Sequence, residues 1–261
     1  MSGAGDTAGP SAASPLAERY DAVFFETIDS TSAEANRRAA EGAPHGTLIW
    51  AAEQTAGHGR RGRPWRSPIG NLYMSVVLRP PVSPARAAEL AFVAVVALAD
   101  ALAPVLPPAV ELALKWPNDL LLNGAKIAGI LLEAEAAATS DRVSSVVLGI
   151  GVNLVSAPQG TPYPATCLAD LGVILQPSQM LRRLTDALAA RYAEWIEIGF
   201  SPIRAAWLAR ARGLGSPIEL HRDGGVIVGS FADLDITGAL VMDTAEGRRR
   251  VTAGDVFFAA G

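Results

Sequence analysis

The sequence has little of what marks secreted or metal-binding proteins. It contains one cysteine, Cys167, in 261 residues, which excludes an intrachain disulfide. Its three histidines, His45, His58 and His221, lack the spacing of metal ligands, so no zinc site is indicated. Residues 1–15 lack a basic start followed by an apolar run, so they do not resemble a signal peptide. These absences favour a reducing, cytoplasmic location.

The chain also lacks an excess of positive charge. Its formal net charge is -4 and its pI is about 5.4, so no overall attraction to nucleic acid or to a membrane surface is expected. The longest apolar run, residues 88–106, contains Glu89 and Asp100, which favours a buried helix over a membrane span. No G-K-[ST] phosphate loop, complete dinucleotide fingerprint or G-x-S-x-G motif is present.

Strand and helix patterns follow one another along the rest of the chain. Strands are expected at 22–28, 46–54, 71–80 and 144–154, and residues 110–136 indicate two strands around a turn. Helices are expected at 29–42, from Ser83-Pro84 to Ala103, and after Ser178. From Leu214 the chain indicates short strands with evenly spaced turns. The predicted class is α+β: a disordered tail at 1–20, a mixed-sheet domain flanked by helices at 21–212, and a small β-barrel at 213–261.

The stretch "GHGRRGRPW", residues 57–65, combines flexibility with positive charge. Gly57, Gly59 and Gly62 permit backbone conformations that are closed to other residues and a close approach of N–H groups to a ligand. Arg60 and Arg63 offer forked donors that suit phosphate or carboxylate oxygens. A solvated basic turn has the same composition, so this stretch alone leaves both interpretations open.

A second cluster lies in "KWPNDLLLNGAKIAGILLE", residues 115–133. Asp119 suits Mg²⁺ or a ligand hydroxyl, and Lys115 or Lys126 suits a phosphate. Lys126 stands in an apolar strand, where its ammonium needs a partner or a ligand unless its stem extends to water. In "GIGVN", residues 149–153, the two glycines leave room for a flat ligand, and Asn153 can both donate and accept.

These motifs together resemble the biotin–protein ligases. "DSTS", "EQTAGHGRRGRPW", "NLYMSVVLRP", "LKWPNDLLLNGAKIAGILLE" and "LGIGVNL" occur in that family's order and spacing. The resemblance runs from about residue 22 to the C-terminus and implies a class II synthetase-like catalytic domain followed by an SH3-like barrel. It implies that biotin and ATP, with Mg²⁺, form biotinyl-5′-AMP, and that biotin then passes to a lysine of a biotin carboxyl carrier protein. A monomer and a homodimer both remain open.

The resemblance also implies roles for individual residues. Lys126 and Arg60 are similar to the catalytic pair that stabilises charge where carboxylate meets phosphate. The implied biotin contacts are Ser30, Thr31, Gln54, Gly57, Arg60, Lys126, Gly129 and Gly151. The implied nucleotide contacts are His58, Arg61, Arg63, Trp65, Lys115, Asn118, Asp119 and Asn153. Asp119 and Asn153, in the region of Lys115, are implied to lie near Mg²⁺.

Two positions depart from the family pattern, and two rival functions remain. His58 replaces a common arginine, which weakens the charge of the loop near neutral pH. Ser32 replaces a frequent asparagine and is expected to alter only a helix cap. About 21 residues precede the first strand, too few for the winged-helix repressor domain of many members, so no repressor function is expected. A lipoate–protein ligase and a nucleic-acid-binding module using the loop arginines are the alternatives.

Overall fold

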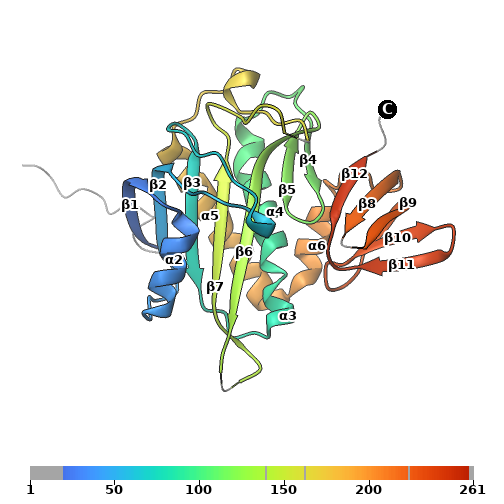
Figure 1. The fold of residues 1–261 in the computed structure, drawn as a ribbon, viewed down its shortest axis with the longest axis horizontal. Coiled ribbons are helices and arrows are strands. Elements are labelled where there is room, and N and C mark those ends of the chain that lie inside the picture. The colour runs from blue at the N-terminus through green and yellow to red at the C-terminus, as the bar shows by residue number, and fades with distance from the viewer. Residues whose placement is uncertain (1–19, 139, 162, 223, 259–261) are drawn as a thin grey trace, which may run out of the picture.

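The protein consists of two β-sheets, one of them flanked by helices (Figure 1). The computed structural model describes residues 20–138, 140–161, 163–222 and 224–258. The seven-stranded sheet has the order β1-β2-β3-β7-β6-β5-β4, and the five-stranded sheet has the order β11-β10-β9-β8-β12. This arrangement confirms the predicted α+β class. Of the expected disordered tail, residues 1–19 lie outside the described residues. Tyr20 is buried, and its hydroxyl donates to the carbonyl of Thr185 at 3.3 Å.

The larger sheet is mixed, with one parallel pair. Its strands are β1 (Asp21–Ile28), β2 (Thr47–Gln54), β3 (Leu72–Leu78), β4 (Leu112–Lys115), β5 (Asp119–Leu122), β6 (Ala125–Ala136) and β7 (Val143–Val152). β1 and β2 run parallel and are joined through helix α2 (Thr31–Ala40), while the other neighbouring strands run antiparallel. The crossover therefore brings the N-terminus of α2 close to the end of β2.

The expectation of two strands within residues 110–136 is wrong, because this region forms three. β5 lies between β4 and β6, and a two-residue turn at Asn123-Gly124 connects it to β6. Both turn residues have positive φ, 49° and 80°. Asn-Gly is the pair that such hairpin turns favour, so the sequence carried a signal that the two-strand interpretation overlooked.

Alternate residues of the central strands face two different layers. On β3, Met74 and Val76 belong to the main core, which is built with helices α4 (Leu90–Leu102), α5 (Pro177–Ile198) and α6 (Phe200–Leu208). Val77 belongs to a smaller cluster with the alanines of α2. Figure 1 shows α2 in front of the sheet and α4 and α5 behind it. The period of two along a strand thus places α2 alone on the front face and leaves much of that face uncovered.

The helix expected from Ser83 to Ala103 is divided into α3 (Pro84–Ala87), α4 and the 3₁₀ turn η2 (Ala103–Val105). Ser83 caps α3 by accepting from the backbone N–H of Arg86 at 3.4 Å. Residues 84–105 are the one described segment long and apolar enough to cross a membrane, and 67% of their most apolar window is buried inside the protein. The segment therefore packs as a core helix, as its acidic residues predict.

The smaller sheet is antiparallel and is attached to the larger domain by apolar and polar contacts, since its buried Phe231 packs against Trp207 of α6 in the same core. It contains β8 (Pro217–Arg222), β9 (Gly225–Leu234), β10 (Leu240–Thr244), β11 (Gly247–Val251) and β12 (Asp255–Phe258). Trp116 donates its indole N–H to the carbonyl of Gly238 at 3.0 Å. Arg204 of α6 contacts both carboxylate oxygens of Asp233 at 2.7 Å. These contacts hold β12 beside the uncovered face of the seven-stranded sheet.

Candidate functional site

One row of residues across five strands forms the floor of a cavity. Tyr73, Gly151, Gly129, Asp119 and Lys115 are successive register partners on β3, β7, β6, β5 and β4. Gly151 has the same parity as Val147, which faces α2, so the row lies on the uncovered face. A cavity of about 810 Å³ lies over it. Glycine at two consecutive positions of the row keeps this floor flat.

The indole of Trp65 lies directly on this floor. A Cβ atom at Gly151 would lie 2.7 Å from the indole, and one at Gly129 would lie 3.3 Å from it. The indole Nε1 is buried and lacks a hydrogen-bond partner among the described residues. The structure therefore brings together Trp65, expected at the nucleotide, and the two glycines expected against biotin.

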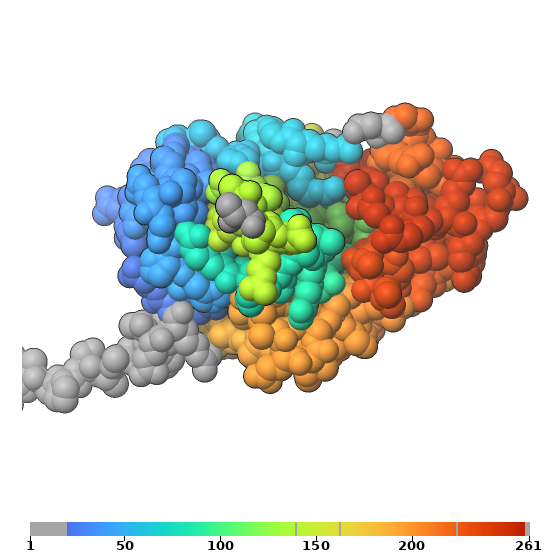
Figure 2. Space-filling model, turned by 90° about the horizontal axis from the view of Figure 1, so that it is seen from below, coloured from blue at the N-terminus to red at the C-terminus, as the bar shows by residue number. Residues whose placement is uncertain are grey.

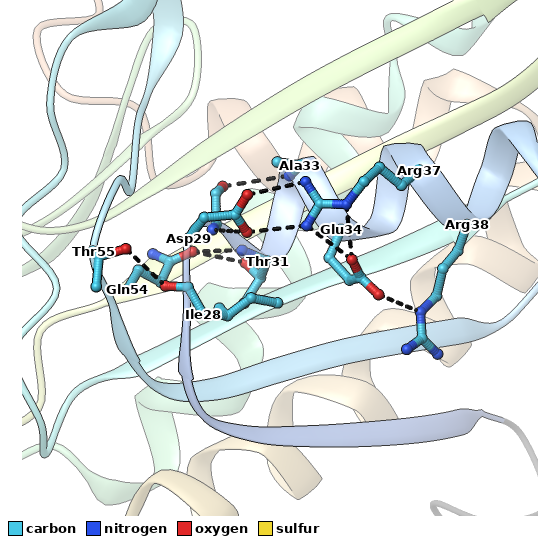
Figure 3. Close-up of polar contacts among 10 residues, drawn as sticks. Ile28, Asp29, Thr31, Ala33, Glu34, Arg37, Arg38, Gln54 and Thr55 are labelled. Atoms are coloured by element: carbon cyan, nitrogen blue, oxygen red, sulfur yellow. Dashed lines mark hydrogen bonds and ion pairs between the residues drawn. The ribbon is translucent and has the colours of Figure 1, made fainter.

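One end of the cavity is lined by neutral polar groups at the start of α2. The backbone N–H and the hydroxyl of Thr31 both donate to Oε1 of Gln54, at 2.8 and 3.1 Å (Figure 3). The hydroxyl of Ser75, on β3, lies 2.9 Å from that of Thr31 and 3.0 Å from that of Ser32. Ser30 caps the helix, accepting from the N–H of Ala33 at 3.4 Å. Ser32 therefore lines the cavity, and the expectation that it alters only the cap is wrong.

An ion-pair network outside the cavity fixes this polar end. Arg37 donates to both carboxylate oxygens of Asp29, at 2.9 and 3.0 Å, and Glu34 pairs with Arg37 and Arg38 at 2.8 Å (Figure 3). The hydrogen bond from Arg37 lowers the pKa of Asp29. The carbonyl of Asp29 also accepts from the N–H of Ala56 at 2.8 Å. Asp29 thus ties the start of α2 to the root of the glycine-arginine loop.

The glycine-arginine loop folds across the front of the sheet with a short 3₁₀ turn, η1 (Arg60–Gly62). Gly62 has φ of 68°, as expected for a glycine chosen for its conformation, and Arg61 also has a positive φ of 58°. Gly57 is required for a different reason. A Cβ atom there would lie 2.6 Å from the hydroxyl of Ser67, so close packing rather than an unusual backbone explains this glycine.

The C-terminal sheet holds the loop in place (Figure 2). Nη2 of Arg63 lies 2.5 Å from Oδ2 of Asp255 on β12, and Nη1 of Arg60 lies 3.9 Å from Oδ1 of the same residue. Arg60 also donates to Oδ1 of Asn118 at 3.2 Å. Burial alone would raise the pKa of Asp255, but the hydrogen bond and charge of Arg63 hold it below its ordinary value. Burial lowers the pKa of Arg60, against the opposing charges of Asp255 and Asp119.

Lys126 projects into the cavity from β6. Its Nζ lies 2.5 Å from Oδ1 of Asp119 and 5.5 Å from the centre of the Trp65 ring. A Cβ atom at Gly129 would lie 3.3 Å from the same Nζ. The ammonium therefore has a partner within the cavity. Of the two alternatives that the sequence left open, a partner for the charge or a stem that extends to water, the structure shows the first.

Lys115 is the more buried of the two lysines, with 6% of its surface exposed. Its Nζ lies 3.7 Å from the centre of the Tyr163 ring and within 6 Å of Phe257 and Phe258. Among residues 20–258 that are described, no carboxylate lies within ion-pair distance of it. Burial lowers the pKa of Lys115 to about 8, although the charge of Asp119 opposes this shift. A buried cation surrounded by aromatic rings is a ready site for an anion.

The remaining predicted residues mainly hold the walls of the site. Asn118 donates to the carbonyl of Ile130, and Asn153 donates to the carbonyl of Thr166 at 3.1 Å. His58 forms an isolated bridge with Pro64 across the base of the loop. In the described part of the chain, no group of three His, Cys, Asp or Glu residues is placed to hold a metal ion. Asp119 is the carboxylate of the floor row, a donor that Mg²⁺ accepts when phosphates supply further oxygens.

The structure also adds lining residues that the sequence did not indicate. The main additions are Tyr73, Tyr163, Asp255 and Phe257, and Ser75 supports the polar end from behind it. Asp255 lies 192 positions from Arg63, and no local pattern marks it, so its role depends on how the two sheets meet. Tyr73 and Ser75 are two residues apart on β3, so the period of two along a strand predicts that both lie on the same face of the sheet.

The comparisons with known proteins agree with this geometry. The model of the Biotin/lipoate A/B protein ligase family matches residues 24–153, and that of the Biotin protein ligase C terminal domain matches residues 213–259. A biotin–[acetyl-CoA-carboxylase] ligase of Paracoccus denitrificans is 44% identical over 88% of this chain and 97% of its own length. A ligase of the same name from Mycobacterium tuberculosis is 38% identical over 87% of this chain and 85% of its own length.

A solved structure shares the fold as well. The biotin protein ligase of Aquifex aeolicus in complex with biotin and ATP is 25% identical, covers 90% of this chain and 97% of its own chain, and has a TM-score of 0.76. Its coverage extends over both sheets, as does that of the Paracoccus relative. By sequence, domain order and fold, this chain belongs to the biotin protein ligases of the biotin/lipoate A/B protein ligase family.

Proposed function

We propose that this chain condenses biotin with ATP to biotinyl-5′-AMP and transfers the biotinyl group to a lysine of a biotin carboxyl carrier protein. The names of its Paracoccus and Mycobacterium relatives and the ligands of the Aquifex structure support this function. The observation that carries it is the cavity itself. A neutral polar end, a flat glycine floor, and an end with Lys126 and Arg60 follow one another in a single space.

The neutral end suits the ring of biotin. Biotin's fused ring ends in an uncharged urea, which needs donors and acceptors but no ion pair. Ser30, Thr31 and Gln54 supply hydroxyl and amide groups of that kind, with Ser75 and Ser32 beside them. The Trp65 indole lies on Gly129 and Gly151 in this structure, so the ring would move aside for the valeryl chain to run along the floor toward Lys126.

The charged end suits the first chemical step. A carboxylate oxygen of biotin attacks the α-phosphorus of ATP, and the bond to the β-phosphate oxygen breaks to release pyrophosphate. Negative charge accumulates on the oxygens between the two reactants. Lys126 and Arg60 would contact these oxygens, and because they are already fixed by Asp119 and Asn118, little reorganisation is needed during the reaction.

The nucleotide would extend from Lys126 toward Lys115 and the C-terminal sheet. Lys115 offers its buried charge to a phosphate, and Arg61, Arg63, His58 and Trp65 surround the same space, with Asn118 and Asn153 holding its walls. Mg²⁺, when bound with ATP, neutralises the triphosphate, and Asp119 is the residue that fits it. Asn153 donates its amide to the chain, which suits wall support better than a metal.

In the second step, the amine of a carrier lysine attacks the acyl carbon of the adenylate. The bond between that carbon and the phosphate oxygen breaks, and AMP leaves. Until that amine arrives, the intermediate has to be protected from water. The glycine-arginine loop lies over the cavity and is held by Asp255, so it can exclude water. We assign the reaction to the cytoplasm and to a chain that acts as a monomer or as a homodimer.

Isotope exchange between ATP and pyrophosphate tests this function directly. The purified chain should exchange label when biotin is present and should not do so with lipoate. Because the family model covers both kinds of ligase, lipoate-dependent exchange would replace biotin with the rival substrate. Transfer is then followed as the mass increase of a purified carrier domain, and a carrier whose target lysine is replaced by arginine serves as the control.

A further inference from the structure

The mouth of the cavity carries a strong local excess of positive charge. Among its described lining residues are five arginines and two lysines against two aspartates, whereas the whole chain has a net charge of -4. The arginines are Arg60, Arg61, Arg63, Arg66 and Arg222. Both aspartates are already paired, Asp119 with Lys126 and Asp255 with Arg63. The surplus charge is therefore available to something outside the chain.

Two of these arginines have no part in holding the site together. Arg66, just after the glycine-arginine loop, and Arg222, at the end of β8, are both exposed. Within the described part of the chain, neither forms an ion pair. They come from segments far apart in the sequence, and the contact between the loop and the C-terminal sheet brings both to the lining of one cavity. They differ in this respect from Arg60 and Arg63, which are turned toward Asn118 and Asp255.

We propose that Arg66 and Arg222 form a docking rim that selects an acidic protein surface around the target lysine of the carrier. The inference rests on the proposed transfer to a carrier lysine, since that step requires the carrier to lie against the mouth of the cavity. The docking rim would determine which lysine receives biotin and would leave the formation of the adenylate unchanged.

Charge repulsion makes this rim selective. An ammonium that enters a ring of guanidinium groups is repelled, so an isolated lysine, or a lysine among basic residues, approaches unfavourably. Carboxylates flanking the target lysine offset this repulsion by pairing with the exposed rim while the lysine passes between them. The rim thus admits a lysine of one particular setting and disfavours the many other lysines of a cell.

The test separates docking from chemistry. Arg66→Gln, Arg222→Gln and the double variant are compared with Arg142→Gln, which changes an exposed arginine outside the cavity. Three rates are measured: biotin-dependent exchange between ATP and pyrophosphate, transfer from preformed biotinyl-5′-AMP to a purified carrier domain, and transfer to hydroxylamine. The carrier reaction is run at about 20 mM and about 500 mM salt, because screening suppresses pairing of exposed charges.

The double variant should lower kcat/KM for the carrier roughly tenfold at low salt and lose most of the salt dependence. Exchange and transfer to hydroxylamine should stay within about twofold, as for local loss of a rim contact. Arg66→Glu should regain activity with a carrier whose flanking acidic residues are changed to lysine.

Several results would overturn the docking rim. Unchanged carrier kinetics in the double variant, or an equal loss in Arg142→Gln, would show that these positions do not select the carrier. Inhibition of transfer by a DNA duplex that the double variant no longer binds would assign the rim to nucleic acid. Absence of exchange in the unmodified chain would instead refute the proposed function, so the two failures are distinguishable.

Discussion

In the proposed mechanism, Lys126 is the residue on which the chemistry depends most. Its ammonium is oriented by Asp119 and held against the glycine floor, so it meets a charged transition state without moving. Lys126→Ala should lower the rate of biotinyl-5′-AMP formation by on the order of 100-fold or more, as for loss of one charge stabiliser. Single-turnover formation of the adenylate measures this, with thermal unfolding as the control for folding. Formation at the wild-type rate would remove Lys126 from its catalytic role.

In the proposed mechanism, Lys115 makes the binding of the nucleotide depend on pH. Because its pKa is lowered to about 8, its positive charge is present below that pH and is lost as the pH rises through it. KM for ATP should therefore rise between about pH 7 and about pH 9.5, in the direction set by loss of one cation. Lys115→Arg should flatten this profile, because a guanidinium stays charged over the whole range. An unchanged slope in that variant would show that another group titrates.

At the scale of elements, the turn between β9 and β10 depends on one carboxylate. Oδ1 of Asp235 accepts from the N–H of Thr237 at 2.8 Å and of Ala239 at 3.0 Å, and Arg250 pairs with the same residue. Burial alone would raise the pKa of Asp235, but these hydrogen bonds lower it to about 2. A carboxyl group whose pKa is depressed on folding stabilises the fold above its unfolded pKa. That contribution is lost as the pH falls from about 4 to about 2.

Asp235→Asn should therefore lower the free energy of unfolding by about 2 kcal/mol at pH 7 and reduce the acid sensitivity of the protein below about pH 4. Urea unfolding at a series of pH values measures both effects. Asp243→Asn is the matched control, because its partner Arg248 lies on an exposed part of the same sheet. Equal acid sensitivity of wild type and Asp235→Asn would contradict this account.

Most elements followed from local patterns, and the exceptions have physical causes. The apolar spacing after Ser178 predicts one buried face of α5: Leu181, Leu184, Leu188 and Trp195 are buried, whereas Tyr192 of the same face is half-buried. The three strands within 110–136 were harder to predict from sequence. A four-residue strand such as β5 has too few residues to show a period of two.

The candidate site was partly within reach of sequence. Motifs located Lys126 and Arg60, and the structure brings both into one cavity. Asp255, Phe257 and Phe258 were out of reach because they belong to a separate sheet, and Tyr163 was out of reach because it lies outside the regular elements, after β7. The motifs also pointed to the glycines of the loop and the floor. Sequence could not show why Gly57 has to be glycine, because the reason is its close packing against Ser67.

At the scale of the whole molecule, the C-terminal sheet contacts the proposed active site through Asp255, which pairs with Arg63. Asp255→Asn should weaken the hold on Arg63, so that biotinyl-5′-AMP leaves the enzyme about tenfold faster, as for loss of one charged hydrogen bond. Filter binding of labelled intermediate measures this release, and protease cleavage within residues 57–66 reports how firmly the loop is held. Asp243→Asn should change neither. Tight retention by Asp255→Asn would show that the loop closes without the second sheet.

The unpaired indole nitrogen of Trp65 makes the enzyme its own optical probe. Of the five tryptophans in the chain, Trp65 and Trp116 line the cavity, and Trp65 lies on the glycines of its floor. A vitamin or nucleotide arriving there has to displace the ring or offer its N–H an acceptor, and either event changes the polarity that the ring senses. Emission from the unlabelled protein can thus follow each arrival and departure in real time, with Trp65→Phe as the silent reference.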